Sequence, residues 1–343
     1  MRTNVMMIPK NHEYIRKLRS NLLKIGVEVG LLKPFHYSSF SNIAKILYYR
    51  MRHYRIVHVH WLYIFPVGFA MKMFYYFCRS LGIKIIWEMH NILPHHYKES
   101  DRRNSRWLYE KSDAIIFHSE KDIERAKELL GTNVCKPFVA IPHGSFNGSY
   151  ENRVSKDEAR AILNLSQDSK VILCFGFIRE NRGYEYLIEA TKEMTGVEVV
   201  IAGKVDNQET YRQILQFEKK SPNLRVIAKW IADDEIQVYF NACDIVVLPY
   251  TSITTSGVIP LAYAFSKPVI TTKIGGIEDV VNRNTGILVP PCDVNSLKTA
   301  IHDLLGMDYE AMGRFACEYS QRSFNWEPIA KEIKKLYESV LYA

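Results

Sequence analysis

The sequence predicts an α/β protein of two domains, each built on a parallel β-sheet with crossover helices. Short β-rich runs alternate with longer helical patterns along the whole chain, an order typical of parallel sheets. A chain of 343 residues is longer than a single domain with one hydrophobic core usually is. A polar stretch rich in Gly, Ser and Asn, residues 143–156, separates two series of elements and has the composition of an exposed linker.

The first series predicts strands and an amphipathic helix. The helix covers residues 11–26, where Tyr14, Leu18 and Leu22 recur at helical spacing before Gly26. The apolar segment 61–78 is interrupted by Pro, Gly and Lys, and a bilayer span needs about 20 predominantly apolar residues, so we expect a buried or interfacial helix there. The expected strands are residues 4–8, 55–60, 84–90, 114–119 and 135–141.

The second series repeats the same alternation after the linker. Its expected strands are residues 170–177, 197–203, 224–229, 245–250, 268–272 and 286–290. Its expected helices are residues 183–193, 207–219, 233–242, 257–265 and 295–305. We therefore divide the chain into a first domain (1–150), a second domain (151–322) and a C-terminal helix (323–343) that crosses back to the first domain. In open parallel sheets ligands bind outside the carboxyl ends of the strands, so the substrate site is expected between the domains.

The charge is unevenly distributed. Residues 1–150 carry 23 Lys and Arg against 11 Asp and Glu, a formal +12, while the whole chain carries +8. A basic half suits an anionic membrane surface or an anionic substrate, and no nucleic-acid-binding signature is present, so no nucleic-acid partner is expected. The scattered cysteines and the absence of a signal-peptide pattern at the N-terminus predict a cytoplasmic protein, with membrane association at the inner face left open.

The strongest functional signal lies in residues 245–281. A buried strand ends at Pro249-Tyr250, and a small polar loop, Thr254-Thr255-Ser256-Gly257, then opens a helix. Amide groups at a helix N-terminus and nearby hydroxyl groups bind anions such as phosphate. An ordinary helix cap is the alternative for such a loop taken alone.

The surrounding segments resemble glycosyltransferase family four, whose retaining enzymes have the two-domain GT-B fold. The match runs in order over nearly the whole chain. Besides residues 245–281, the matching segments are HNILPHH (90–96), DAIIFHSE (113–120), IPHG (141–144), FGFIRENRGYEYLIEA (175–190), IAGK (201–204), DDEIQVYFNACDIVVLPY (233–250), TGILVPP (285–291) and FNWEPIAKEIKKLYESVL (324–341).

The resemblance implies a donor site in the second domain. Arg182, at the position where the family places a Lys, would hold the donor diphosphate and act in catalysis, and Arg179 would replace the family's usual Arg, since Phe177 stands there. The Arg fork suits phosphate because it binds bidentately and stays charged. The remaining donor-binding residues that the resemblance implies are Gly203, Lys204, Trp230, Ile231, Thr254, Thr255, Ser256 and Gly257, with the nucleobase beside Trp230 and Ile231.

Two glutamates that many family members carry around the donor helix are missing. Ile253 and Leu261 occupy their positions. We therefore expect a subgroup in which the hydroxyl groups of the polar loop take over contacts with the sugar or the phosphates. An inactive relative stays open.

Histidines supply the candidate residues of the first domain. The resemblance makes His90 a catalytic-site residue facing the reacting sugar, and we place Asn91, His60, His118 and His143 at the acceptor site or lining the cleft; the alternative for each is a hydrogen-bonded structural histidine. His58 and His60 alternate with apolar residues and point to the same side of a strand. Metal binding by this pair is an open alternative, but the sequence shows no carboxylate or Cys set beside them, and no D-x-D motif ends a strand, so no metal and no cofactor are expected.

The resemblance therefore implies a hexosyltransferase that moves a sugar from a UDP- or GDP-sugar to a glycan or lipid-linked saccharide acceptor in polysaccharide or glycolipid synthesis, with retention of anomeric configuration. Arg16, Lys17, Arg19 and Lys24 are the candidate membrane contact. Two alternatives remain: a sugar-nucleotide epimerase on a similar fold, and a non-catalytic scaffold that binds nucleotide sugars.

Overall fold

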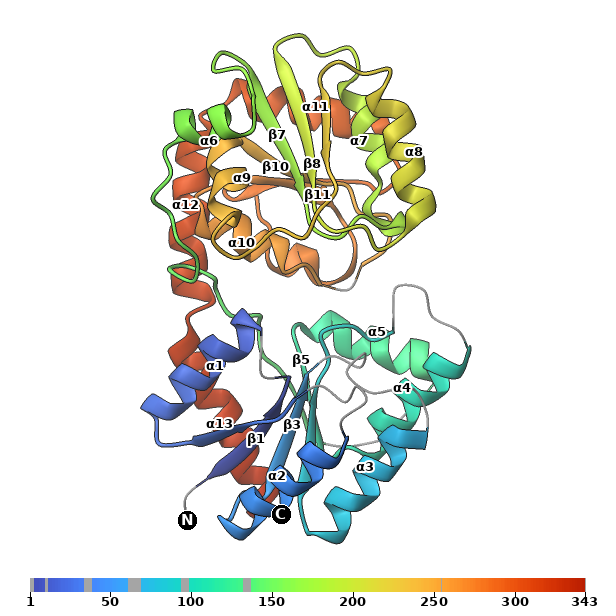
Figure 1. The fold of residues 1–343 in the computed structure, drawn as a ribbon, viewed down its shortest axis with the longest axis vertical. Coiled ribbons are helices and arrows are strands. Elements are labelled where there is room, and N and C mark those ends of the chain that lie inside the picture. The colour runs from blue at the N-terminus through green and yellow to red at the C-terminus, as the bar shows by residue number, and fades with distance from the viewer. Residues whose placement is uncertain are drawn as a thin grey trace. The chain divides into compact units, whose positions relative to one another are not determined.

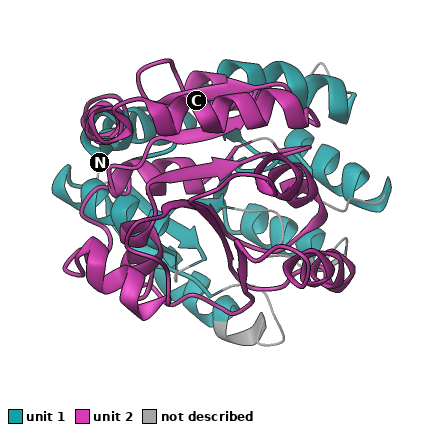
Figure 2. Cartoon of the chain, turned by 90° about the horizontal axis from the view of Figure 1, so that it is seen from above, with its two compact units in different colours: residues 1–144, 324–343 teal, residues 145–323 magenta. Residues whose placement is uncertain are grey.

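The computed structural model describes residues 3–9, 12–33, 39–60, 69–93, 99–131, 137–253 and 255–342. The chain divides into two compact units, which Figure 2 colours separately. Unit 1 comprises residues 1–144 and 324–343, and unit 2 comprises residues 145–323. Each unit is an α/β domain with its own parallel sheet (Figure 1), which confirms the predicted fold class.

Unit 1 contains a parallel sheet in the order β2-β1-β3-β4-β5-β6. Its strands are β1 (Asn4–Ile8), β2 (Glu28–Leu31), β3 (Ile56–His60), β4 (Lys84–Glu88), β5 (Ala114–Phe117) and β6 (Phe138–Ala140). Its helices are α1 (Glu13–Lys24), α2 (Ser39–Met51), α3 (Phe69–Ser80), α4 (Glu99–Lys111), α5 (Glu120–Leu130) and α13 (Trp326–Tyr342). Strand β2 is absent from the sequence prediction, because a four-residue run with a glycine and a glutamate carries little strand signal.

Helix α1 is positioned by its cap and by α13. The His12 side chain accepts a hydrogen bond from the Tyr14 amide at 3.2 Å and so caps the helix. The apolar stripe that includes Tyr14, Leu18 and Leu22 is buried, and α1 packs against α13. These contacts direct the Tyr14 side chain into unit 1.

Unit 2 contains a parallel sheet in the order β12-β11-β10-β7-β8-β9. Its strands are β7 (Lys170–Phe175), β8 (Val197–Ala202), β9 (Leu224–Ile227), β10 (Ile245–Leu248), β11 (Val269–Thr272) and β12 (Gly286–Val289), all within the expected runs. Its helices are α6 (Lys156–Ile162), α7 (Tyr184–Thr191), α8 (Gln208–Glu218), α9 (Ile236–Ala242), α10 (Val258–Ala264), α11 (Val294–Gly306) and α12 (Tyr309–Ser323), with short 3₁₀ turns at Glu180–Arg182 and Gly275–Asp279.

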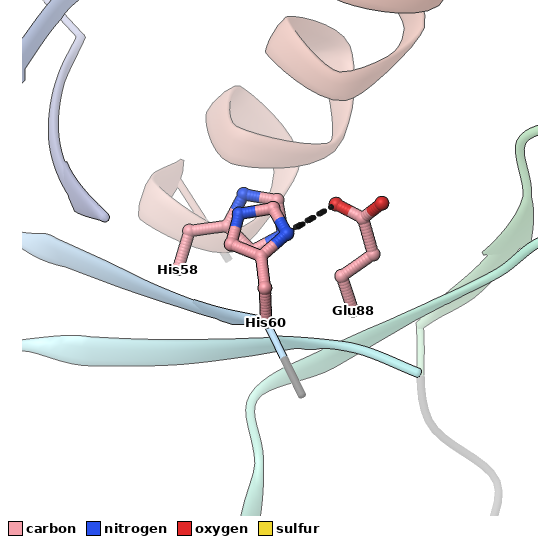
Figure 3. Close-up of side chains that lie close together, drawn as sticks. All are labelled: His58, His60 and Glu88. Carbon is pink, nitrogen blue, oxygen red and sulfur yellow. Dashed lines mark ion pairs between the residues drawn. The ribbon is translucent and has the colours of Figure 1, made fainter. Parts of the chain in front are cut away.

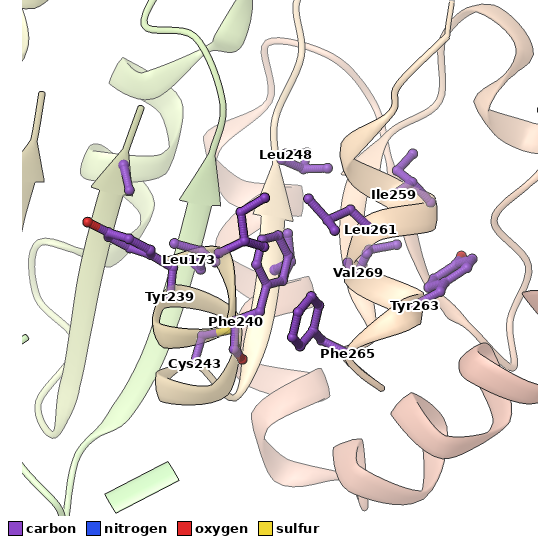
Figure 4. Close-up of a cluster of buried hydrophobic side chains, with 14 of the residues drawn as sticks. Leu173, Tyr239, Phe240, Cys243, Leu248, Ile259, Leu261, Tyr263, Phe265 and Val269 are labelled. Atoms are coloured by element: carbon purple, nitrogen blue, oxygen red, sulfur yellow. The ribbon is translucent and has the colours of Figure 1, made fainter. Parts of the chain in front are cut away.

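The core of unit 2 explains the apolar residues of the donor segment. Figure 4 shows Phe240 of α9 and Phe265 packed beside β10, with Leu261 on α10 in the same cluster. Ile253 also belongs to this cluster and is 9% exposed. Ile253 and Leu261, at the two positions where the resemblance implies glutamates, therefore contribute here to hydrophobic packing.

Helix α3 covers the second half of the apolar segment 61–78, whose first eight residues lie outside the described part of the chain. In the described ranges, no helix combines the length and the apolar character that crossing a bilayer requires.

Candidate functional site

The loops after β7 and β10 meet at the carboxyl edge of the unit 2 sheet. These strands are parallel neighbours, so their loops leave from the same edge. Two hydrogen bonds join the loops: the Thr251 amide donates to the Asn181 carbonyl oxygen at 3.1 Å, and the Asn181 side-chain amide donates to the Ser252 carbonyl oxygen at 2.6 Å. The structure thus brings together the two segments that sequence analysis assigns to donor binding.

A chain of polar groups runs through these loops. Arg182 Nη1 donates to the Tyr250 hydroxyl at 2.9 Å and to the Phe175 carbonyl oxygen at 3.2 Å, and the guanidinium carbon lies 5.0 Å from the centre of the Tyr250 ring. The Tyr250 hydroxyl in turn lies 2.7 Å from Ser256 Oγ. Arg182 is 8% exposed, which places its positive charge in a weakly solvated setting at the end of the sheet.

Gly183 permits this approach. Its backbone is left-handed, with φ of +64°, and a Cβ added there would lie 2.0 Å from the Pro249 carbonyl oxygen. Any other L-residue would push the two loops apart.

We expect Gly183→Ala to lower the free energy of unfolding by about 2 kcal/mol in urea titrations, from the left-handed backbone and the contact with Pro249. Gly306→Ala is the matched control, because a Cβ at Gly306 meets nothing within 4 Å; its effect should stay below about 0.5 kcal/mol. Equal stability of the two variants would contradict the proposed close approach.

The polar loop itself differs in part from its expected geometry. Thr254 lies outside the described residues, Thr255 and Ser256 are partly exposed, and Gly257 is exposed. Helix α10 has only seven residues, and the amide of its first residue, Val258, already donates to Ser256 Oγ at 3.3 Å. The helix terminus is therefore a weaker anion site than the sequence suggests, which leaves more of the role to Arg182 and the hydroxyl groups.

Aromatic side chains flank the ends of β7 and β9. Phe177 and Trp230 are 36% and 64% exposed, and their ring centres lie 6.2 Å apart. The Arg179 guanidinium carbon lies 4.8 Å from the Phe177 ring centre, and its Nε lies 3.4 Å from an Asp206 carboxylate oxygen. Arg179 thus sits between an aromatic ring and a carboxylate. Ile231 is buried, at 8% exposure.

Gly203 and Lys204 follow β8. A Cβ at Gly203 would lie 2.0 Å from the Gly176 carbonyl oxygen, so glycine is required where the β7 and β8 loops cross. The Lys204 carbonyl oxygen accepts from the Ile178 amide at 2.9 Å, while the Lys204 residue is exposed.

In unit 1, histidines gather at the carboxyl edge of the sheet. His60 ends β3, His90 follows β4, His118 follows β5, and His143 follows β6. His118 Nε2 lies 2.9 Å from His90 Nδ1, and His90 Nε2 lies 3.4 Å from His60 Nδ1. The His143 ring centre is 5.5 Å from that of His118. The structure therefore brings these four predicted residues into one cluster, with the partly buried Asn91 next along the chain from His90.

The proton positions follow from the backbone. His118 Nδ1 lies 3.1 Å from the Ile141 carbonyl oxygen, which can only accept. A neutral His118 therefore carries its proton on Nδ1 and accepts through Nε2 from His90 Nδ1. His90 Nε2 is then the acceptor nitrogen of a neutral His90.

Glu88 and Tyr14 complete the cluster and were not among the sequence candidates. Glu88, the last residue of β4, is fully buried, and the Tyr14 hydroxyl donates to its Oε1. His58 Nε2 and His60 Nδ1 each lie 3.1 Å from Glu88 Oε2 (Figure 3). A carboxylate at the end of an otherwise apolar strand, KIIWE, is the signal that could have found it.

Burial controls the charges in this cluster. Desolvation lowers the pKa of His60 to about 4 and holds the pKa of His90 well below its ordinary value, so both imidazoles are neutral near pH 7. Burial alone would raise the pKa of Glu88, but the neighbouring imidazoles of His60 and His58 hold it well below its ordinary range. The cluster thus combines the neutral imidazoles of His60 and His90 with a buried carboxylate.

Comparison with known proteins finds a family model that matches much of unit 2 and relatives of low sequence identity. Residues 169–307 match the family model described as glycosyl transferases group 1. The putative teichuronic acid biosynthesis glycosyltransferase TuaC of Bacillus subtilis is 24% identical over 266 residues. That match covers 76% of this chain and 64% of TuaC, so the chain spans less than two thirds of its relative's length.

Solved structures share the whole fold. Sucrose-phosphate synthase from Thermosynechococcus elongatus superposes with a TM-score of 0.78 at 19% identity, covering 100% of both chains. Anabaena HepE in complex with UDP and glucose gives a TM-score of 0.78 at 16% identity, covering 99% of this chain and 100% of HepE. The family match lies within unit 2 and the fold match covers both units: residues 169–307 are similar to the group 1 glycosyl transferases, and the chain has the fold of the GT-B glycosyltransferases.

Proposed function

We propose that this chain transfers a hexose from a UDP- or GDP-sugar to a glycan or lipid-linked saccharide acceptor, with retention of anomeric configuration. The observation that carries the proposal is the chain of polar groups from Arg182 through Tyr250 to Ser256. It offers a buried cation and hydroxyl groups at the carboxyl edge of the unit 2 sheet, where a diphosphate leaving group would be bound.

In the proposed reaction the bond between the anomeric carbon and the donor phosphate oxygen breaks, and its electron pair leaves with the nucleoside diphosphate. The acceptor hydroxyl forms the new bond on the same face, and its proton passes to a donor phosphate oxygen. Arg182 stabilises the charge that develops on the leaving diphosphate. This assignment gives the diphosphate a protein cation, so no metal is required at the donor.

The aromatic pair Phe177 and Trp230 is proposed as the nucleobase site. Both rings are exposed, Phe177 just after β7 and Trp230 just after β9. Aromatic rings stack on pyrimidine and purine bases alike, so the pair suits the base of UDP or of GDP. HepE, which shares the fold, was solved with UDP-glucose. A uracil donor is therefore the first to test here.

The acceptor is assigned to unit 1. His90 and its histidine neighbours offer nitrogens that position hydroxyl groups, and His90 is proposed to orient a sugar rather than to remove its proton. The formal +12 of residues 1–150 suits an acceptor linked to lipid through phosphate. Helix α1, whose Arg16, Arg19 and Lys24 are exposed, is the proposed contact with an anionic membrane face.

The test is an assay of the full chain with a panel of UDP- and GDP-sugars, with and without a membrane lipid extract, following nucleotide release and donor identity. We expect nucleotide release that depends on the lipid extract, at the same rate with and without added Mg²⁺. Isomerised donor without an acceptor would indicate an epimerase instead. Saturable donor binding without turnover would indicate a scaffold, and either result would overturn the proposal.

A further inference from the structure

We propose that His58, His60 and Glu88 form a binding site for a divalent transition-metal ion, for which the ligand set favours Zn²⁺. The three side chains lie in unit 1 and are fully buried. Their nitrogen and carboxylate oxygen atoms lie within 4.8 Å of one another. Two imidazoles and a carboxylate are a ligand set that zinc commonly takes from proteins.

The sheet holds the three ligands in place. His58 and His60 are two residues apart on β3 and therefore face the same side, and Glu88 is the register partner of His60 on β4. Figure 3 shows both imidazoles turned toward the Glu88 carboxylate. The site is thus built on two paired strands rather than on loops, which gives its ligands fixed positions.

The separations fit a metal ion. His58 Nε2 and His60 Nδ1 each lie 3.1 Å from Glu88 Oε2. Ligand atoms about 2.1 Å from a tetrahedral zinc are separated by about 3.4 Å, so an ion fits among these atoms after small side-chain movements. His90 Nε2 lies 3.4 Å from His60 Nδ1, next to the proposed ligands.

The contact between His58 and Glu88 is not a well-formed hydrogen bond. Although 3.1 Å apart, His58 Nε2 and Glu88 Oε2 are not aligned for hydrogen bonding with each other, and each lacks a hydrogen-bond partner among the described residues. Buried polar atoms without partners are costly. A metal ion would use both lone pairs.

The groups behind the ligands have the arrangement of a metal site. The Tyr337 hydroxyl lies 2.7 Å from His58 Nδ1, the nitrogen that would not bind the ion. The Tyr14 hydroxyl donates to Glu88 Oε1, the second carboxylate oxygen. Partners of this kind orient metal ligands and fix the imidazole tautomer.

The negative charge of Glu88 also favours a bound cation. Within the described ranges, every ion pair of Glu88 is with a histidine, and none is with Lys or Arg. A buried carboxylate without a cationic partner is destabilising, and a divalent cation would neutralise it. The second possible set, Glu88 with His90 and His118, is less suited, because His118 Nε2 already bonds His90 Nδ1 at 2.9 Å.

The proposed metal site belongs to unit 1, whereas the donor diphosphate is proposed to bind to unit 2 without metal. The sequence expectation of no metal was based on the lack of a carboxylate beside His58 and His60. Glu88 is 28 residues from His60 in the chain, and only strand pairing places it there.

The test is metal analysis of the full chain purified without a polyhistidine tag. We expect about one zinc per chain, from three protein ligands around one ion. Glu88→Gln, which keeps the shape and removes the charge, and His58→Gln should each lower the zinc content at least about tenfold, the scale of losses when a ligand or its support is removed. His302→Gln is the matched control, because that side chain is 85% exposed in unit 2, and it should retain the metal.

A second measurement uses only the wild-type protein, so it tests the site even if the variants do not fold. Wild-type protein stripped with a strong chelator is titrated with Co²⁺, which is expected to give the intense visible absorption of a tetrahedral nitrogen and oxygen site. Zn²⁺ should abolish that absorption and raise the melting temperature by roughly 5 °C or more. The proposed site is wrong if the metal-free wild-type protein titrated with Co²⁺ gives only the spectrum of aqueous Co²⁺. It is also wrong if both variants fold and still retain zinc. These readouts do not depend on sugar transfer, so the site and the proposed function fail separately.

Discussion

Arg182→Ala is expected to lower kcat for sugar transfer at least about 100-fold, the cost typical of a lost electrostatic stabiliser. The guanidinium is 8% exposed and donates to Tyr250, whose hydroxyl lies 2.7 Å from Ser256 Oγ. Negative charge grows on the leaving diphosphate as the sugar bond breaks, and a positioned cation stabilises that charge more than the intact donor. Steady-state kinetics with the donor identified by the panel assay will measure the effect.

Two further variants separate catalysis from folding. Arg212→Ala removes an arginine that is 71% exposed on α8 and should leave kcat unchanged. Arg182→Lys keeps a positive charge but loses the planar fork, so it should recover part of the lost rate. A folded Arg182→Ala protein with wild-type turnover would remove Arg182 from the catalytic site, whatever its melting temperature.

The donor half of the candidate site could be predicted from the sequence, because its polar residues lie in segments that can be recognised along the chain. Arg182 and Ser256 lie in the segments that follow β7 and β10, and loops after parallel strands share one edge of a sheet. The connection between them could not be predicted, because it depends on the Tyr250 hydroxyl reaching both side chains. A tyrosine at a strand end gives no indication of which way its hydroxyl points.

The histidine cluster shows what could not be predicted from the sequence. Each histidine can be recognised in the sequence near the end of a strand. Glu88 becomes the central anion of the histidine cluster only through the register of β3 with β4. Tyr14 belongs by sequence to the apolar stripe of α1, and its hydroxyl reaches Glu88 because α1 is packed on α13. Periodicity identifies which face of a helix is buried, and it does not identify the polar group that the buried face meets.

The stability of unit 2 depends on a second buried charge, at Asp244. This carboxylate directly precedes β10 and accepts from Lys156 Nζ at 2.6 Å, from Arg160 Nη2 at 2.8 Å and from the Val171 amide at 2.7 Å. Arg160 is itself 3% exposed. Asp244 therefore joins α6, β7 and β10 and neutralises a buried guanidinium.

We expect Asp244→Asn to lower the free energy of unfolding by about 3 kcal/mol at pH 7, because it leaves the Arg160 charge buried without a carboxylate. Urea titration measures the difference. Asp303→Asn is the matched control, since the Asp303 side chain is 51% exposed on α11, and its effect should stay below about 0.5 kcal/mol. A loss for Asp244→Asn as small as the control's would show that the ion pair contributes little.

The pH dependence of this difference gives a second check. Burial alone would raise the pKa of Asp244, but the hydrogen bonds from Lys156 and the Val171 amide and the charge of Arg160 hold it below its ordinary value of 3.8. A carboxylate whose pKa is lower in the folded state stabilises the fold above the unfolded-state pKa and loses that contribution as pH falls through the folded-state pKa. The gap between wild type and Asp244→Asn should therefore stay constant from pH 7 down to about pH 5 and shrink below about pH 4. A gap that grew on acidification would mean that the fold favours the protonated form of Asp244, which the four hydrogen-bond donors around the carboxylate oppose.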